Sequence, residues 1–66
     1  MDIFRYYLTY RYGALPQCCL AIHDCRGMTY FNQIQREAYG WVEYDRELSE
    51  EDKNTYGLIG PEIRTI

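Results

Sequence analysis

The chain has 66 residues, a formal net charge of −3 at pH 7 and a hydrophobic fraction of 47%, which together indicate one small globular domain. An aromatic content of 17% is too high for an intrinsically disordered chain. The acidic balance argues against a nucleic-acid partner, because it leaves no basic surface. The charge is uneven: residues 1–36 carry four arginines against two aspartates, and residues 37–66 carry eight acids against three bases.

No segment of the sequence reads as an export signal or a membrane span. Arg5 and Arg11 interrupt the first fifteen residues, so no apolar signal-peptide core is present. No apolar run approaches the ~20 residues that cross a bilayer. The three cysteines are an odd number, which without export favours reduced thiols over a disulfide framework. We therefore expect a cytoplasmic protein that does not contact a membrane.

Residues 2–11 alternate with a period of two, which predicts a half-buried strand. One face of this strand carries Phe4, Tyr6, Leu8 and Tyr10, and the other carries Arg5, Tyr7, Thr9 and Arg11. Gly13 and Pro16 mark a connection. A second strand is predicted at about residues 17–23, followed by a turn at 24–27.

The second half of the chain predicts a further strand and a helix. Residues 28–38 fit either one or two helical turns or an irregular connection. Residues 39–46 predict a third strand that turns Val42 and Tyr44 inward. Ser49 and the acids after it indicate a helix start, and Gly57 indicates its end. The tail from 62 to 66 adds a short edge strand or frays.

These elements predict one α+β domain over residues 1–66, with a small, mostly antiparallel three-stranded sheet and a C-terminal helix packed on one face. If both aromatic-rich strands turn their even positions inward, the core receives Phe4, Tyr6, Leu8, Tyr10, Val42 and Tyr44. The outer face then places Arg5 and Arg11 near Glu43 and Asp45, as complementary charges across neighbouring strands.

A zinc site is the first chemical candidate, because four soft ligands lie within eight residues: Cys18, Cys19, His23 and Cys25. Their spacing argues against it. On a strand Cys18 and Cys19 point to opposite faces, and Cys19 and His23 are roughly 13 Å apart at ~3.3 Å per residue. Zinc ligands lie ~2.0–2.3 Å from the metal. We expect no bound metal and interpret Cys18 as a small core residue.

Catalysis has two weak candidates. His23 and Cys25 share a strand face, so a Cys–His pair is conceivable, but a lone histidine near a turn is more often an exposed polar residue. The carboxylates between Glu43 and Asp52 surround a helix start, where solvated anions are favourable, and their spacing is not that of an EF-hand. Because so short a chain has little room for a substrate pocket, we expect no enzymatic activity and no cofactor.

Aromatic residues on the outward face are the remaining signal. The predicted protein-binding face consists of Arg5, Tyr7, Tyr39, Trp41 and Glu43, since Trp, Tyr and Arg are enriched at binding hot spots. A second interpretation, of equal weight, is another packing layer in which the segment 24–38 folds over this face. Stacking of single-stranded nucleic acid is a third interpretation, which the acidic surroundings disfavour.

Two stretches of the sequence carry a resemblance to known proteins. One is AYGWVEYDREL at 38–48, followed by Ser49-Glu50-Glu51-Asp52 and Tyr56; the other is FRYYL at 4–8, with Arg11-Tyr12 and Leu15-Pro16. Together they resemble small uncharacterised accessory proteins encoded on conjugative transposons of Gram-positive bacteria. The resemblance covers about half of the chain. It implies a cytoplasmic protein carried by a mobile element, and it supplies no activity or catalytic residue.

The function expected from the sequence is therefore a non-enzymatic protein–protein interaction module that is accessory to a mobile genetic element. Its partner is an unidentified protein. The alternative is a nucleic-acid-associated regulator, or an acidic protein that mimics DNA. The oligomeric state stays open, although an uncovered edge strand at 17–23 would favour a dimer.

Overall fold

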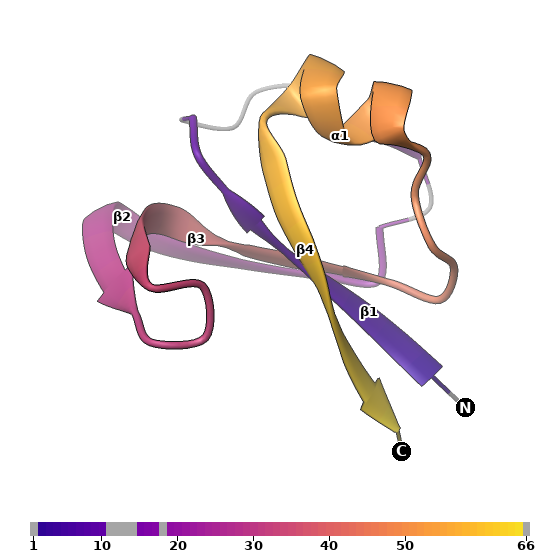
Figure 1. Ribbon diagram of the computed structural model, residues 1–66, viewed down its shortest axis with the longest axis horizontal. Helices are drawn as coiled ribbons and strands as arrows, with labels where there is room; N and C mark the ends of the chain where they lie inside the picture. The colour runs from indigo at the N-terminus through magenta and orange to yellow at the C-terminus, as the bar shows by residue number, and fades with distance from the viewer. Residues whose placement is uncertain (1, 11–14, 18, 66) are drawn as a thin grey trace.

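In a computed structural model of the chain, which describes residues 2–10, 15–17 and 19–65, the described residues form a four-stranded antiparallel sheet and one short helix (Figure 1). The elements along the chain are β1 (Asp2–Leu8), β2 (Ala21–Phe31), β3 (Arg36–Tyr44), α1 (Glu50–Tyr56) and β4 (Leu58–Thr65). The strand order in space is β2-β3-β1-β4, so β1 and β3 lie inside the sheet. Over these residues no helix has the length and apolar character needed to cross a membrane.

The prediction of a three-stranded sheet is wrong, because the C-terminal segment forms a full edge strand. β4 pairs with β1 from Asp2↔Thr65 to Leu8↔Leu58. Gly60-Pro61 lies inside β4, where the pairing is irregular between Arg5 and Tyr7 of β1. Proline is tolerated in an edge strand or at a bulge, since no ladder hydrogen bond is lost there. The Gly-Pro pair therefore interrupts the register without ending the strand.

β2 also differs from the prediction, since it begins at Ala21 and continues through the expected turn to Phe31. Asp24 and Arg26 do form the local contact typical of a turn: the Asp24 carboxylate accepts the Arg26 backbone N–H at 2.8 Å. Arg26 and Gly27 have positive φ angles of 55° and 143°. Their conformation produces a bulge within the strand. The chain reverses later, at residues 32–35, so residues 28–38 form neither helical turns nor an irregular connection.

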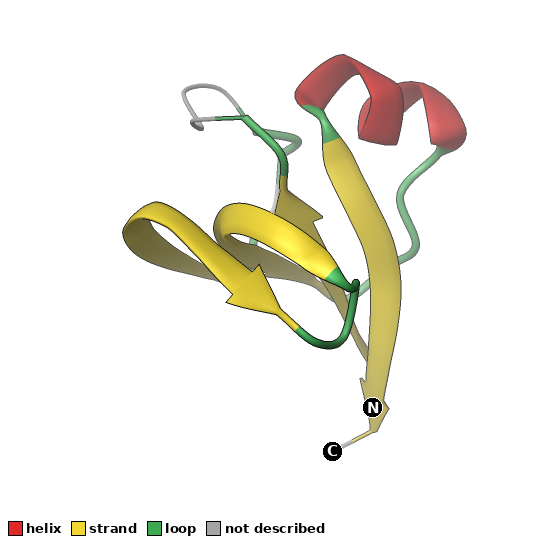
Figure 2. Ribbon diagram, turned by 60° about the vertical axis from the view of Figure 1, so that its left-hand side comes forward, coloured by secondary structure: helices red, strands yellow, loops and turns green. Residues whose placement is uncertain are grey.

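Gly40 allows β3 to approach β2 closely at this bulge. Its φ is 149°, and a Cβ at this position would collide with the backbone carbonyl of His23. The pairing passes from Asp24↔Gly40 to Thr29↔Ala38, so the two strands are irregular at this point. The β2–β3 hairpin is strongly curled as a result (Figures 1 and 2). Its far end reaches β1, where the ring of Phe31 packs on the ring of Tyr7 with the two centroids 4.9 Å apart.

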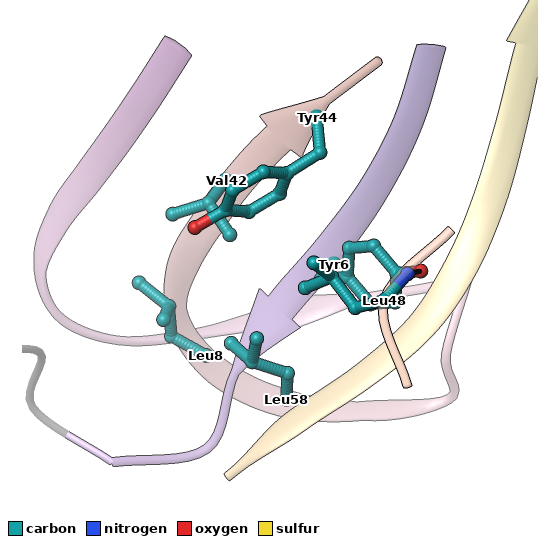
Figure 3. Close-up of a cluster of buried hydrophobic side chains, with 6 residues drawn as sticks. All are labelled: Tyr6, Leu8, Val42, Tyr44, Leu48 and Leu58. Carbon is teal, nitrogen blue, oxygen red and sulfur yellow. Dashed lines mark hydrogen bonds between the residues drawn. The ribbon is translucent and has the colours of Figure 1, made fainter. Parts of the chain in front are cut away.

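The main core lies on the opposite face of the sheet (Figure 3) and contains Tyr6, Leu8, Val42, Tyr44, Leu48 and Leu58. The alternation of β1 and β3 thus places four predicted residues correctly, and Phe4 packs against them partly buried. The inward position predicted for Tyr10 is wrong: its relative exposure is 63%, because β1 ends before it.

Two core tyrosines also bind backbone groups. The Tyr6 hydroxyl accepts the Leu48 N–H at 2.7 Å, and the Tyr44 hydroxyl donates to the Pro16 carbonyl at 2.7 Å. Each bond ties a connecting segment to the sheet and satisfies a polar group that burial would otherwise penalise.

α1 begins and ends at the residues that the sequence predicts. The Ser49 side chain accepts the Asp52 N–H as N-cap, and Gly57 closes the helix with a φ of 64°. None of the residues of α1 is buried, and the helix lies at one end of the sheet beside the start of β4 (Figure 1). Leu48, Tyr56 and Leu58, which lie before, at the end of and after the helix, provide its contact with the core.

Substitution of Gly40 by alanine should destabilise the fold much more than substitution of Gly27. Both glycines have similar positive φ angles, of 149° and 143°, but only Gly40 lies against backbone atoms. The backbone strain alone should cost about 1–2 kcal/mol in Gly27→Ala, and the added collision should raise the loss to about 3 kcal/mol or more in Gly40→Ala. Urea unfolding of both variants measures the difference. Equal losses would show that the approach of β3 to His23 is not tight.

Candidate functional site

The register of β1 and β3 brings predicted site residues together on the face opposite the main core. Arg5 is paired with Glu43, and Tyr7 is paired with Trp41. β2 adds His23 beside Trp41, and β4 adds Glu62 beside Arg5. We call the surface formed by Arg5, His23, Trp41, Glu43, Glu62 and Arg64 the Arg5–Trp41 face.

Trp41 is the centre of this face. The guanidinium carbon of Arg5 lies 4.0 Å from the centroid of the Trp41 ring, which is a cation–π geometry. The His23 ring stacks on Trp41 with centroids 5.1 Å apart and an interplanar angle of 20°. Arg5 and His23 come from β1 and β2, the strands on either side of β3. The indole is therefore held in one orientation while it remains partly exposed.

The charges on this face are paired with one another. Arg5 donates to the Glu43 carboxylate from Nη2 at 2.9 Å and from Nε at 3.1 Å, as the cross-strand prediction required. Arg64 Nη1 lies 3.3 Å from the same Glu43 oxygen, and Glu62 lies 3.9 Å from Arg5. Burial lowers the pKa of Arg5, but the hydrogen bonds of Glu43 and Tyr7 outweigh it, so that this pKa is raised.

Tyr7, on β1, is a buried neighbour of the Arg5–Trp41 face and lies next to Trp41. Its relative exposure is 1%, because Phe31 at the end of the curled hairpin covers it. Its hydroxyl donates to Glu62 at 3.3 Å, and burial is the largest cause of the raised pKa of this hydroxyl. The expectation that Tyr7 points into solvent is corrected, since the segment 24–38 folds over this part of the sheet.

Tyr39 lies apart from the other predicted site residues. It is partly buried and packs against the main core cluster, which contains neither Trp41 nor Arg5. The irregular pairing at Gly40 explains this position, because it interrupts the alternation of β3 between Tyr39 and Trp41. The structure thus brings together Arg5, Trp41 and Glu43 at the surface. Tyr7 lies next to them but is buried, and Tyr39 packs elsewhere, against the main core.

The cysteine and carboxylate candidates are separate from this face. Cys19 donates to the Ala21 carbonyl at 3.2 Å, Cys25 is partly buried, and Cys18 lies outside the described residues. In the part of the chain that the structure describes, no three His, Cys, Asp or Glu side chains converge in a way that could hold a metal ion. Exposed carboxylates before and at the start of α1 belong to Asp45, Glu47, Glu50 and Glu51.

The sequence raises an uncovered edge strand at 17–23, but it does not identify the exposed apolar residues that continue along β2 to Tyr30. Leu20 and Ile22, and further along Met28 and Tyr30, have relative exposures between 44% and 58%. The signal was present in the sequence as two pairs of alternate large hydrophobic residues, at 20 and 22 and again at 28 and 30. The bulge at Asp24–Gly27 concealed it, because the same residues have the composition of a turn.

Comparison with known proteins gives one family. A family model described as "Defence against restriction A C-terminal" matches residues 1–61. No curated protein and no solved structure matches the chain.

Buried tyrosines should make the protein lose stability at high pH. Burial raises the pKa of Tyr44 and of Tyr7 above the ordinary tyrosine value, so their neutral forms stabilise the fold. The free energy of unfolding should therefore fall as the pH rises above about 10, where the unfolded chain ionises first.

A Tyr44→Phe variant should lose about 1 kcal/mol at neutral pH with the hydrogen bond to Pro16, and its deficit should narrow as the pH rises. Urea unfolding at a series of pH values measures both chains. A stability difference between the two chains that stays constant across the pH range would contradict the raised pKa of Tyr44.

The Arg5–Glu43 pair should be energetically coupled. A double-mutant cycle with Arg5→Ala and Glu43→Ala should give a coupling energy of about 1 kcal/mol, because both side chains are largely enclosed. The matched control is the Arg64–Glu43 pair, in which Arg64 is 49% exposed. Its coupling energy should be below about 0.5 kcal/mol. Equal coupling in the two cycles would show that enclosure of Arg5 adds nothing.

Proposed function

The chain belongs to the Defence against restriction A C-terminal family, and on this basis we propose that it is a protein-binding module that helps a mobile genetic element to withstand restriction. The family description supports the link to restriction. The resemblance of residues 38–48 to accessory proteins of conjugative transposons supports carriage by a mobile element. The module acts in the cytoplasm, where incoming DNA meets restriction enzymes, and it acts by binding a protein without a cofactor.

The observation that carries the proposal is the arrangement of Trp41 between Arg5 and His23. Binding hot spots are enriched in tryptophan and arginine, and they combine a central apolar anchor with surroundings that exclude water. The two stacking contacts fix the indole before a partner arrives. Little side-chain entropy is then lost on association, which favours affinity.

The charges around Trp41 indicate what kind of surface the partner presents. Arg5 and Glu43 are 15% and 14% exposed and satisfy each other, so they form a rigid rim and need no partner charge. Glu62 and Arg64 are 33% and 49% exposed and can exchange hydrogen bonds with both signs of charge. A protein surface with an apolar pocket and a mixed-charge rim fits this pattern. A polyanion does not fit it, because it would meet the carboxylates of Glu43 and Glu62.

A second candidate function is mimicry of DNA by the acidic segment around the start of α1. Exposed acids there are Asp45, Glu47, Glu50 and Glu51, against Arg46 and Lys53. Lys53 is paired with Glu50 at 2.7 Å, which reduces the negative field. Such mimicry requires a partner with a basic groove, and its binding should weaken steeply as salt rises. Binding through Trp41 should change little with salt.

Loss of the Trp41 stack should abolish partner capture and protection from restriction. Two variants test it: Trp41→Ala, which removes the anchor, and His23→Ala, which removes an exposed ring and should leave the fold intact. The control is Tyr10→Ala, which removes an exposed aromatic ring outside this face. Each tagged chain is used as bait in a nuclease-treated host extract, and circular dichroism confirms folding. In parallel, transfer of the element is measured into restricting and non-restricting recipients.

The proposal requires three results together. The parent chain and Tyr10→Ala retain one stoichiometric protein partner, His23→Ala loses at least about tenfold in captured partner, and transfer of elements with His23→Ala falls only in the restricting recipient. A folded His23→Ala or Trp41→Ala chain that keeps both partner and protection would refute the Arg5–Trp41 face. Retention of the partner only at low salt would favour DNA mimicry.

A further inference from the structure

Exposed apolar side chains are concentrated along one edge of the sheet. Of the six large hydrophobic residues that are exposed in the described chain, four lie between residues 20 and 30. They are Leu20, Ile22, Met28 and Tyr30, and all have even numbers. Because β2 is an edge strand of the sheet that the described residues form, one row of its backbone N–H and C=O groups has no neighbouring strand among those residues.

Three of these side chains, Ile22, Met28 and Tyr30, share one face of β2, and Leu20 directly precedes the strand. Ile22 is paired with Val42, a member of the main core cluster. Phe31, at the other end of β2, points to the opposite face, where it contacts Tyr7. Because side chains alternate along a strand, Tyr30 and Met28 point away from Phe31 and therefore to the same side as Ile22. The result is an apolar row along the edge, interrupted at its centre by the bulge.

The sequence of this edge is self-complementary when two copies are set antiparallel about Cys25. The opposed residues are then Leu20 and Tyr30, Ile22 and Met28, Asp24 and Arg26, and Cys25 with itself. Apolar side chains therefore meet apolar side chains, and each charge meets the opposite charge. Asp24 and Arg26 are both exposed, and neither takes part in a salt bridge among the described residues.

We propose that two copies of this chain associate edge to edge through β2, antiparallel, about a two-fold axis that passes by Cys25. Every contact forms twice in such an isologous interface. The free backbone groups of the two edges bind each other, and the apolar rows come together on one side.

The opposite edge of the sheet is less suited to this pairing. β4 carries Pro61, which lacks a backbone donor, together with Glu62 and Arg64, and proline and charges are devices that protect sheet edges from association. The pairing through β2 uses its even-numbered face and leaves the Arg5–Trp41 face uncovered. Self-association is thus independent of the proposed function, and either can fail without the other.

Oligomeric mass provides the test. The chain has a mass of 8.0 kDa, and sedimentation equilibrium of the full chain in a reducing buffer should show a concentration-dependent dimer. Asp24→Arg should place two arginines opposite each other across the interface, and Arg26→Asp should place two aspartates opposite each other. Each variant alone should raise the dissociation constant at least about tenfold. An equimolar mixture of the two variants should restore the dimer, because both charge pairs are then complementary.

Cross-linking provides a second measurement that does not depend on the charges. In a chain with Cys18→Ser and Cys19→Ser, Cys25 is the one remaining thiol. Directly opposed residues of antiparallel strands have Cα atoms ~4.5–5.5 Å apart, which is within the range that a disulfide spans. Copper phenanthroline with oxygen, which takes up the two electrons and two protons, should convert two Cys25 thiols into one disulfide. Ile22→Lys in the same chain should suppress the cross-link.

The outcomes decide the proposal in either direction. Restoration of the dimer by the mixture, together with the Cys25 cross-link, would support it. A chain that stays monomeric at millimolar concentration would overturn it. A dimer that is indifferent to Asp24→Arg and to Arg26→Asp, with folding of both variants confirmed by circular dichroism, would overturn it as well.

Discussion

The close approach of β3 to β2 at Gly40 is the constraint on which the rest of the structure depends. A side chain here would collide with the His23 carbonyl, so only glycine permits the two strands to curl together at the bulge. The curl brings Phe31 over Tyr7, so that this residue of β1 is buried on the face opposite the main core. Among the described residues the main core is one small cluster, and this second contact gives the central strand apolar packing on its other face.

The same curl determines which aromatic residues of this side of the sheet are exposed and which are buried. It covers Tyr7 and leaves Trp41 held between Arg5 and His23. At the same point of β3, Tyr39 turns to the main-core side of the sheet. The exposed aromatic face and the second packing layer, which were alternatives for one set of residues, therefore both occur on the same side of the sheet. The hairpin buries Tyr7, whereas Trp41 in the Arg5–Trp41 face stays partly exposed. The edge of β2 remains as a separate surface with its own apolar row.

Much of this arrangement can be predicted from the sequence where the determinants are local. Ser49 and Gly57 set the ends of α1 through contacts within a few residues, and alternation alone places Tyr6 and Val42 inside. The pairing of Arg5 with Glu43 follows once both strands are known. For the tail the sequence offers a short edge strand at 62–66 as one of two alternatives, but neither the full length of β4 nor the β2–β3 hairpin could be predicted, because their determinants are not local. Asp24–Gly27 has the composition of a reversing turn, and only the contact of Phe31 with Tyr7 shows that the strand continues. In the same way, the composition of Gly60-Pro61 is typical of a helix end, but in the structure the pair lies at a bulge against β1.

The measurement that tests the account most directly is the nuclear Overhauser spectrum of the isotope-labelled protein in solution. The account predicts cross-peaks between the rings of Tyr7 and Phe31 and between the rings of His23 and Trp41, whose centroids are 4.9 and 5.1 Å apart. It also predicts contacts of Tyr39 with the main core cluster and none with Arg5. If Tyr7 has no contact with Phe31 and its ring is accessible to solvent, the hairpin does not fold over β1, and the assignment of the two surfaces is wrong.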